Sequence, residues 1–271
     1  MTNFATIGTA GAIVGLGALL LGYQVGTSRT VETVAAVTTP STNTGSTLDR
    51  SGIEAIVRDY LVSNPEVLVE AQTALEARRA DQERIAHRDI IASHADQLFN
   101  SPMDAVFGNP DGDVTIVEFY DYNCGYCKRA LPDMDALIES DPNLRFVMKE
   151  FPILGPDSTR AHIVAKAFKT LHPDEYMEFH RELLGSEGRA TEETAMAVAL
   201  KLGADEKQIR EKMTSPDVTA AFQANYELAQ ALNITGTPSY ILSDEVVPGA
   251  VGIEFLAEKI QNIRSGKTAA R

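Results

Sequence analysis

The chain has 271 residues, enough for one large or two small domains. Hydrophobic residues make up 44% of it, so a substantial buried core is expected. With 38 acidic against 24 basic side chains the formal net charge is −14, which argues against nucleic acid as a partner.

The N-terminal segment differs in kind from the rest. Residues 4–23 form an apolar run rich in Gly, Ala and Leu, about as long as the ~20 residues that cross a bilayer. Because no Lys or Arg precedes this run, as one would in a secretory signal, we expect residues 1–26 to be a membrane anchor. The alternative is a signal segment cleaved near residues 34–36. Residues 27–48, rich in Thr, Ser, Val and Ala, are predicted to be a flexible linker.

Residues 49–99 are predicted to be a helical region. A capping box, Ser51-x-x-Glu54, precedes the first helix, and Asn64-Pro65 precedes a second one that runs to about Phe99. Apolar side chains follow helical spacing in the first helix: Ile53, Ile56, Val57, Tyr60 and Leu61. Such a pair of helices buries little by itself. It either packs on the domain that follows or serves as an oligomerisation region.

A short strand at residues 105–107 and a nearly continuous apolar strand at 114–120 come next. The only two cysteines, Cys124 and Cys127, follow the second strand at the start of a predicted helix. Unpaired N–H groups and the dipole at a helix N-terminus lower the pKa of a thiol there. We therefore expect Cys124 to be the reactive thiol and Cys127 to resolve a mixed disulfide on it, which is thiol–disulfide exchange.

Two other interpretations of this pair are weaker. A zinc site needs two more ligands, but no third cysteine exists and the five histidines include no H-x(3–5)-H pair. Inert packing of both thiols fits poorly with Gly125 between them and with Lys128 and Arg129 after them. We therefore expect no metal and no organic cofactor, only a redox-active disulfide within Cys-Gly125-Tyr126-Cys.

The rest of the chain alternates helices with short strands. Pro132 should kink or break the helix that begins at Cys124, and a strand follows at residues 144–151. Residues 158–233 are expected to be helical. Helix N-caps are indicated at Ser158, Thr191 and Asp205, helix ends at Gly185 and Gly203, and the start of the last helix at Ser215. Two short strands, 239–242 and 245–247, precede a final amphipathic helix carrying Ile253, Leu256, Ile260 and Ile263.

Glu118 stands in the most apolar strand, six residues before Cys124. A buried carboxylate is costly unless it is paired, and burial raises its pKa. Lys149, in the neighbouring strand, is the candidate partner, and the pair could shuttle the proton of Cys127. A purely structural ion pair, or a water-exposed edge position, is the alternative.

Three motifs carry a family resemblance: residues 117–129, 149–156 and 235–240. Together they resemble the catalytic domain of the DsbA-like thiol–disulfide oxidoreductases, and above all oligomeric envelope members with an N-terminal helical region. The resemblance implies an α/β thioredoxin fold over residues 100–267, with a helical insertion at about 158–233. It also implies that Pro238 is cis and faces the disulfide and that Thr237 adjusts the reactivity of that disulfide. Both residues are implied to bind substrate.

The implied function is thiol–disulfide exchange with unfolded or misfolded envelope proteins, with electrons passing to a membrane redox partner. The dipeptide Gly125-Tyr126 favours an isomerase or a dedicated oxidase. Because a disulfide donor needs an oxidising compartment, we expect the bacterial periplasm, tethered through residues 4–23 or reached with a cleaved signal, and a homo-oligomer. The alternatives are a non-catalytic holdase or scaffold, and a copper(I)-binding metal-stress protein that uses the two thiols.

Overall fold

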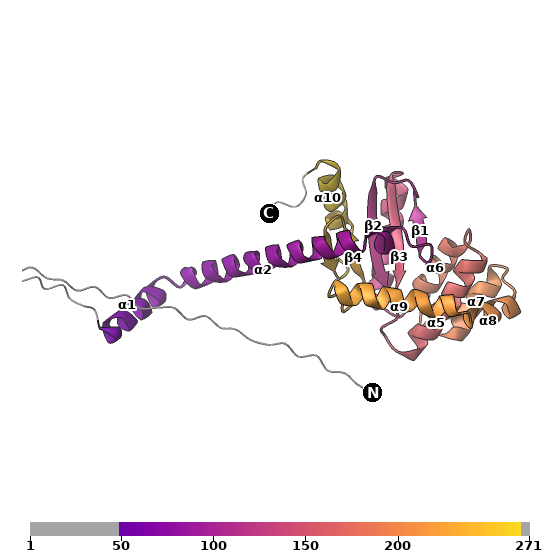
Figure 1. Ribbon diagram of the computed structural model, residues 1–271, viewed down its shortest axis with the longest axis horizontal. Helices are drawn as coiled ribbons and strands as arrows, with labels where there is room; N and C mark the ends of the chain where they lie inside the picture. The colour runs from indigo at the N-terminus through magenta and orange to yellow at the C-terminus, as the bar shows by residue number, and fades with distance from the viewer. Residues whose placement is uncertain (1–48, 267–271) are drawn as a thin grey trace, which may run out of the picture. The chain divides into compact units, whose positions relative to one another are not determined.

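The computed structural model describes residues 49–266, and a five-stranded sheet forms its centre (Figure 1). The strands are β1 (Ala105–Gly108), β2 (Val114–Tyr120), β3 (Leu144–Glu150), β4 (Ser239–Leu242) and β5 (Glu245–Pro248). Their order is β1-β3-β2-β4-β5, with β2 and β3 parallel and the other pairs antiparallel. The central position of β2 explains its nearly continuous apolar sequence, because both of its faces are covered.

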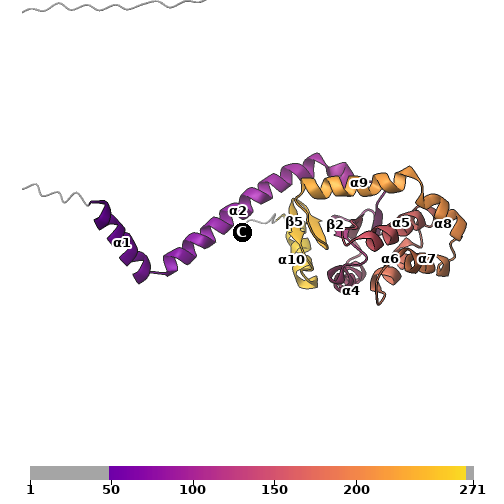
Figure 2. The same cartoon turned by 90° about the horizontal axis from the view of Figure 1, so that it is seen from below.

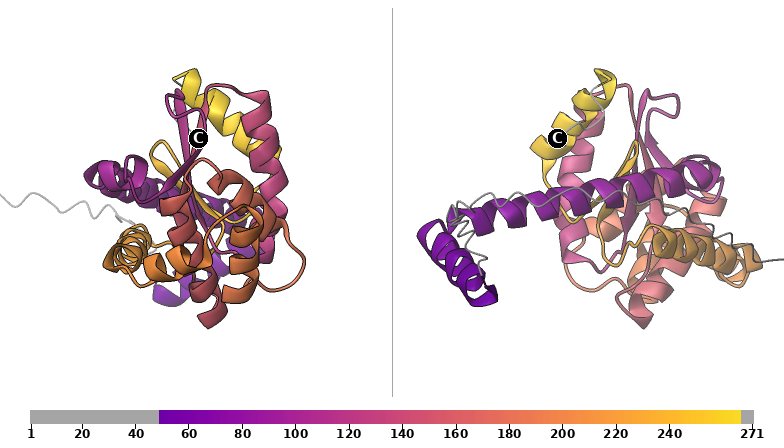
Figure 3. Two further views of the ribbon diagram at one scale, coloured as in Figure 1. Left: turned by 90° about the vertical axis from the view of Figure 1, so that its right-hand side faces the viewer. Right: turned by 60° about the vertical axis from the view of Figure 1, so that its left-hand side comes forward.

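Helices cover both faces of this sheet. The helices of the described residues are α1 (Arg50–Ser63), α2 (Glu66–Ser93), α3 (Ala95–Phe99), α4 (Gly125–Ser140), α5 (Pro156–Leu171), α6 (Tyr176–Gly185), α7 (Glu192–Lys201), α8 (Glu206–Met213), α9 (Pro216–Ala231) and α10 (Ile253–Arg264), of which α1 has no buried residue and covers neither face. The helices α4 and α10 lie side by side on one face (Figures 2 and 3), where Met134 and Leu256 join the larger core cluster. Ile91 of α2, Leu98 of α3 and Leu228 of α9 fill the opposite face with Val117.

The helical insertion follows β3. In Figures 1 and 2, α5 to α8 gather beyond the sheet, on the side away from α10, and they extend the larger core cluster. Thr191 caps α7 and Asp205 caps α8 through their side chains, as predicted, and α6 ends at Gly185. The thioredoxin-like α/β fold with its inserted helices therefore agrees with the sequence-based expectation.

The N-terminal helices depart from the prediction in two details. Asp49, not Ser51, caps α1, because the Asp49 carboxylate accepts the Gly52 N–H at 2.8 Å. The second helix ends at Ser93, short of the predicted Phe99. There the Ser93 hydroxyl donates to the Ile90 carbonyl at 2.8 Å, a side-chain bond that competes with helix continuation.

Two local features downstream differ from expectation. The break offered for Pro132 is absent: α4 runs through Pro132, because Leu131 and Met134 beside it are buried and packing outweighs one lost hydrogen bond. Ser158 is not a helix cap: α5 begins at Pro156, and the Ser158 hydroxyl instead donates to Asp121.

The chain divides into two units after Asp59, so α2 belongs to the compact unit that carries the sheet. The predicted membrane anchor or signal segment (1–26) and the linker (27–48) lie outside the described residues. Between residues 49 and 266, no helix combines the length and apolarity that a membrane crossing requires.

Candidate active site

The two cysteines lie where β2 passes into α4. Cys124 occupies the N-cap position of α4 with an extended backbone (φ −80°, ψ 114°), and Cys127 lies in the first turn. Both are free thiols, with exposed fractions of 6% for Cys124 and 0% for Cys127. A sulfur at the N-cap faces the unpaired N–H groups of the first helical turn, which favour its anionic form. Of the two thiols, Cys124 is therefore the one that solvent and a partner reach.

The pKa values of the two thiols are shifted in opposite directions from that of an ordinary cysteine. A hydrogen bond from Cys127 is the main cause that lowers the pKa of Cys124 to about 5, and Thr237 and the N–H groups of Cys127 and Tyr126 add to it against partial burial. Burial is the main cause that raises the pKa of Cys127 far above its usual value, aided by Cys124 and Glu118. At neutral pH Cys124 is a thiolate and Cys127 keeps its proton, the division of roles that a nucleophile and a resolving thiol require.

The loop before β4 meets the cysteines from the other side. Its Thr237–Pro238 peptide bond is cis, as the family resemblance implied, and the Cys124 sulfur lies 3.0 Å from the Thr237 carbonyl oxygen, to which the protonated form of the thiol donates. Antiparallel pairing of β4 with β2 holds this loop beside the end of β2. The Gly249 N–H donates to the Pro238 carbonyl at 2.8 Å, which ties the loop to the chain after β5. Thr237 and Pro238 thus lie in direct reach of the reactive sulfur.

The turn that carries Cys124 is held by two side chains that sequence reasoning missed. One Asp121 carboxylate oxygen accepts the Asn123 N–H at 2.8 Å, and the other accepts the Ile153 and Leu154 N–H groups at 2.9 and 3.0 Å. The Asn123 amide exchanges two hydrogen bonds with the Ala190 backbone, at 2.7 and 2.9 Å. The sequence could have indicated only the local bond from Asn123 to Asp121, because Asp and Asn bond to nearby backbone in turns.

A polar network lies buried behind the same turn. The Tyr122 N–H donates to His162 Nε2 at 3.1 Å, and the Tyr176 hydroxyl donates to Glu150 at 2.7 Å. Lys166 approaches Glu150 at 3.6 Å. Burial acts to raise the pKa of Glu150, but Lys166, His162 and the Tyr176 hydrogen bond outweigh it and hold that pKa below its ordinary value. Glu150 therefore stays ionised and supports the turn through its neighbours.

The tyrosines around the turn divide into two groups. The hydroxyls of Tyr120, Tyr122 and Tyr176 converge within 3.1 to 3.4 Å of one another, and all three side chains are buried. They form part of the core and are not available to a substrate. Tyr126, in the dipeptide between the cysteines, is 60% exposed, and the Arg129 guanidinium lies 4.2 Å from its ring centroid. Tyr126 alone of these rings offers an apolar surface beside Cys124.

The predicted pair of Glu118 with Lys149 is wrong. The parallel register aligns Glu118 with Met148, so Lys149 projects from the opposite face of the sheet. Lys149 instead forms a buried ion pair with Asp104 and donates to the Gln97 carbonyl. A one-residue offset in a strand moves a side chain to the other face, and apolar patterning on a strand buried on both sides does not reveal that register.

Glu118 itself lies under the thiols, with an exposed fraction of 4%. Burial raises its pKa to about 8, and the Cys124 charge contributes. In the described part of the chain no ion pair involves Glu118, whose charge in turn raises the pKa of Cys127. Its carboxyl can therefore exchange a proton near neutral pH.

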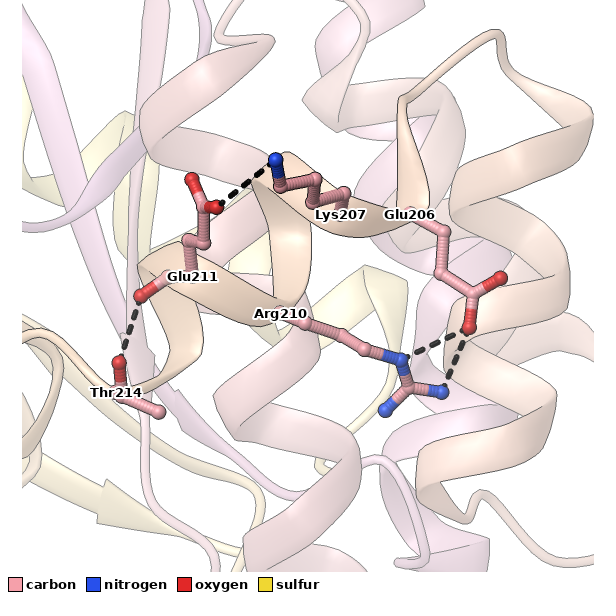
Figure 4. A pocket seen from close by; sticks show the side chains of 5 residues that line it. All are labelled: Glu206, Lys207, Arg210, Glu211 and Thr214. Carbon is pink, nitrogen blue, oxygen red and sulfur yellow. Dashed lines mark hydrogen bonds and ion pairs between the residues drawn. The ribbon is translucent and has the colours of Figure 1, made fainter.

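A hollow lies on the surface of α8, at residues far from the cysteines in sequence (Figure 4). Its charged side chains pair along the helix: Lys207 with Glu211 at 3.8 Å and Arg210 with Glu206 at 2.8 Å. Because these charges satisfy one another, this hollow offers no unpaired group for chemistry. In residues 49–266 no cluster of three or more His, Cys, Asp or Glu side chains forms a metal site.

Comparison with known proteins agrees with this geometry. Residues 115–261, more than half of the chain, match the family model "DSBA-like thioredoxin domain". Residues 49–82 match the "Copper resistance protein ScsC N-terminal domain". A thioredoxin-like oxidoreductase from Silicibacter pomeroyi DSS-3 is 42% identical, with 63% of this chain and 97% of that chain covered and a TM-score of 0.60.

Three further relatives extend the comparison. A linker-deletion mutant of Proteus mirabilis ScsC is 26% identical, with 82% of this chain and 99% of that chain covered and a TM-score of 0.60. Disulfide bond formation protein D of Bacillus subtilis is 24% identical over 172 residues, which are 60% of this chain and 78% of that protein. The chain spans only 25% of the Na(+)/H(+) antiporter NhaA 1 of Salinispora arenicola, which it also matches. The chain thus belongs to the DsbA-like thiol–disulfide oxidoreductases.

Proposed function

We propose that the protein exchanges disulfides with substrate proteins, with Cys124 as nucleophile and Cys127 as resolving thiol. The observation that carries this is the split in thiol acidity at the start of α4, which gives one thiolate and one protonated thiol at neutral pH. The Cys124 thiolate attacks a substrate disulfide, forms a mixed disulfide and releases the other substrate sulfur as a thiolate. Cys127 then loses its proton and attacks the Cys124 sulfur, which closes the Cys124–Cys127 disulfide and leaves two electrons on the substrate.

In the oxidising direction the same steps run backwards. A substrate thiolate attacks Cys124 of the disulfide, and Cys127 leaves. Because the pKa of Cys127 is strongly raised, its departure needs a proton, and the Glu118 carboxyl, with its pKa near 8, is the group placed to supply it. Thr237 and Pro238 hold the substrate backbone beside the Cys124 sulfur. The Thr237 carbonyl oxygen, 3.0 Å from that sulfur, shows how close this loop lies.

The reduction potential tests this proposal and separates its variants. A Cys124 pKa of about 5 lies between about 7 in thioredoxin and about 3.5 in DsbA, whose potentials are about −270 and −120 mV. We therefore expect a reduction potential between these two values, and a value around −180 mV would match protein disulfide isomerase. Equilibration with glutathione, read by alkylation of the free thiols, measures it. A value near −120 mV would instead indicate a strong oxidase, and absence of exchange would refute the proposal.

We propose that the protein acts in the bacterial periplasm on unfolded or misfolded envelope proteins, and that a membrane redox protein exchanges electrons with it. Membership in the DsbA-like family supports this, since structural disulfides form in oxidising compartments. Trapping tests both partners. A Cys127→Ala variant cannot resolve a mixed disulfide, so covalent adducts recovered from its periplasm should contain envelope proteins with cysteines. Recovery of adducts from the cytoplasm alone would contradict the location.

We further propose that the N-terminal helices make the protein a homo-oligomer. The helix α1 has no buried residue, and apolar side chains stand exposed along it and along α2: Ile53, Ile56, Val57, Tyr60, Leu68 and Leu75. A row of this kind is commonly covered by a partner, and a second copy supplies the same apolar row. Light scattering of the wild type should give a multiple of the 29.3 kDa chain mass. Ile56→Glu should dissociate it, Arg58→Glu should not, and a wild-type monomer would refute the proposal.

A second candidate function is copper(I) binding by the two thiols. The match of residues 49–82 to the ScsC copper-resistance domain favours it, and paired thiolates suit copper(I). Against it stands the raised pKa of Cys127, because a ligating sulfur must lose its proton. Native mass spectrometry of the reduced protein with copper(I) decides: one adduct that is lost in Cys124→Ser supports the site, and no adduct ends it.

A further inference from the structure

A groove lies beside the cysteines, and α2 forms one of its walls. Glu83 and His87 of α2 line it together with Tyr126, Thr237 and Pro238. Its volume of about 480 Å³ falls within the range of about 300–1,000 Å³ typical of ligand pockets. The groove therefore joins the N-terminal helical region to the dipeptide and the cis-proline loop of the candidate active site.

The position of α2 along this groove is anchored by packing. Ile91, with an exposed fraction of 4%, packs in the core beside Phe119. His87 and Glu83 lie four and eight residues before Ile91, so all three share one face of the helix. Arg84 adds an ion pair to Asp244 at 3.7 Å, in the turn between β4 and β5. These contacts hold Glu83 and His87 toward the groove.

The charge in this groove is asymmetric. Among the groove residues in the described part of the chain, Glu83 alone carries a formal charge at neutral pH, with His87 counted as neutral. Near the cysteines, Arg129 places a guanidinium over the Tyr126 ring. A substrate segment in the groove thus meets positive charge near Cys124 and negative charge at α2.

We propose that α2 is part of the substrate site and that Glu83 selects cysteine-containing segments with a basic residue placed to reach it. This inference rests on the proposed exchange function and adds substrate selection to it. The apolar ring of Tyr126, 60% exposed, packs on the segment without regard to sequence. Glu83 supplies the charge complementarity, which distinguishes partners more than it strengthens binding.

Model peptides test this selection. Each peptide has one central cysteine in a disulfide with glutathione, and lysine, glutamine or glutamate is placed in turn at four positions on either side. The reduced full-length protein is mixed with each peptide, and the exchange rate is followed. At one or more positions we expect lysine to react about two- to fivefold faster than glutamine, the factor typical of an exposed ion pair, and glutamate to react more slowly.

The variants Glu83→Gln and Glu70→Gln separate the groove from the rest of α2. Both glutamates are exposed on α2, but Glu70 does not line the groove. Glu83→Gln should remove the lysine preference, and Glu70→Gln should keep it. Oxidised glutathione, which carries no lysine side chain for Glu83 to select, should react equally with all three proteins.

A lysine preference that survives in Glu83→Gln would overturn the proposal, as would equal rates for lysine and glutamate peptides in the wild type. A changed rate with oxidised glutathione in Glu83→Gln would also overturn it, because Glu83 would then act on the thiol itself. Failure of the wild type to exchange even with oxidised glutathione would refute the proposed function as well. Normal glutathione exchange without charge preference would refute only the role of α2.

Discussion

The titration of Cys124 offers the most direct check on how the start of α4 works. With a pKa of about 5, the Cys124 thiol is about 99% thiolate at pH 7, whereas an ordinary thiol of pKa about 8.5 would be about 3% ionised. Its largest stabilising contact is the hydrogen bond from Cys127. Removing that donor by Cys127→Ala should therefore raise the pKa of Cys124 and slow its reactions at low pH.

The strength of the hydrogen bond from Cys127 sets the size of this pKa change. A hydrogen bond to a charged group contributes about 1.5–3 kcal/mol, and one pKa unit corresponds to about 1.4 kcal/mol. We therefore expect Cys127→Ala to titrate about one to two units higher, at a pKa of about 6–7. Cys127→Ser retains a donor at the same place, so it should stay within about one unit of the wild type.

Thiolate absorbance at 240 nm against pH, corrected with Cys124→Ser, measures all three midpoints. The alkylation rate by iodoacetamide gives an independent readout. A wild-type midpoint near 8.5 would refute the account of an activated Cys124. Equal midpoints in Cys127→Ala and Cys127→Ser would show instead that the helix N-terminus, and not the second thiol, holds the charge.

Three further predictions concern the groups beneath and around the thiols. Burial is the larger cause that raises the pKa of Glu118 from 4.5 to about 8, and it persists in the oxidised protein, where the Cys124 charge is absent. The oxidised protein should therefore lose up to about 5 kcal/mol of unfolding free energy through Glu118 as pH rises through this window, and in urea denaturation Glu118→Gln should lack this loss. Lys149→Met leaves Asp104 buried without its cation and should lower the unfolding free energy by about 3–5 kcal/mol, or the melting temperature by about 6–20 °C. An unchanged Cys124 titration in this variant would confirm that Lys149 acts apart from the thiols. Asn123→Ala removes both bonds to Ala190 and should cost about 1–3 kcal/mol and slow glutathione exchange; wild-type stability and rate would refute its role in holding the turn.

The sign of the Glu118 effect follows from proton binding. Above pH 4.5 the unfolded chain releases this proton while the folded protein keeps it up to about pH 8, so rising pH favours unfolding. In the reduced protein Cys124 acts in the opposite sense between about pH 5 and 9, because there the folded state has already lost a proton that the unfolded chain retains. The oxidised form removes this Cys124 contribution. The buried His180, whose pKa burial lowers from 6.5 to about 3, still makes stability rise with pH up to about 6.5, so the comparison with Glu118→Gln isolates the Glu118 effect.

Sequence patterns were sufficient for the features that depend on neighbours along the chain. The Cys-x-x-Cys spacing, the strand before it and the helix after it placed Cys124 at a helix N-terminus, where the structure has it. Caps at Thr191 and Asp205 were readable because a cap needs only a polar side chain and the next turn of backbone. Local rules decide such features, so one sequence is enough to find them.

Features that depend on contacts distant in sequence were not readable in the same way. Asp121 is bonded to Ile153 and Leu154, and Asn123 to Ala190, so their roles emerge only when three separate loops meet. The Glu118–Lys149 prediction failed because both strands are buried on both faces, and such strands show no alternation that would reveal their mutual register.

The two carboxyls of Glu118 and Glu150 show what decides the chemistry of this centre. Both lie on the same face of neighbouring strands and both are nearly inaccessible, so burial acts on each in the same direction. Glu150 has Lys166 and His162 beside it and stays ionised, whereas Glu118 has the Cys124 sulfur as its charged neighbour and holds its proton to about pH 8. A carboxyl paired with a lysine could not exchange protons at neutral pH. Because Lys149 lies on the other face, Glu118 has no lysine beside it and can take part in the proton transfer to Cys127 proposed above.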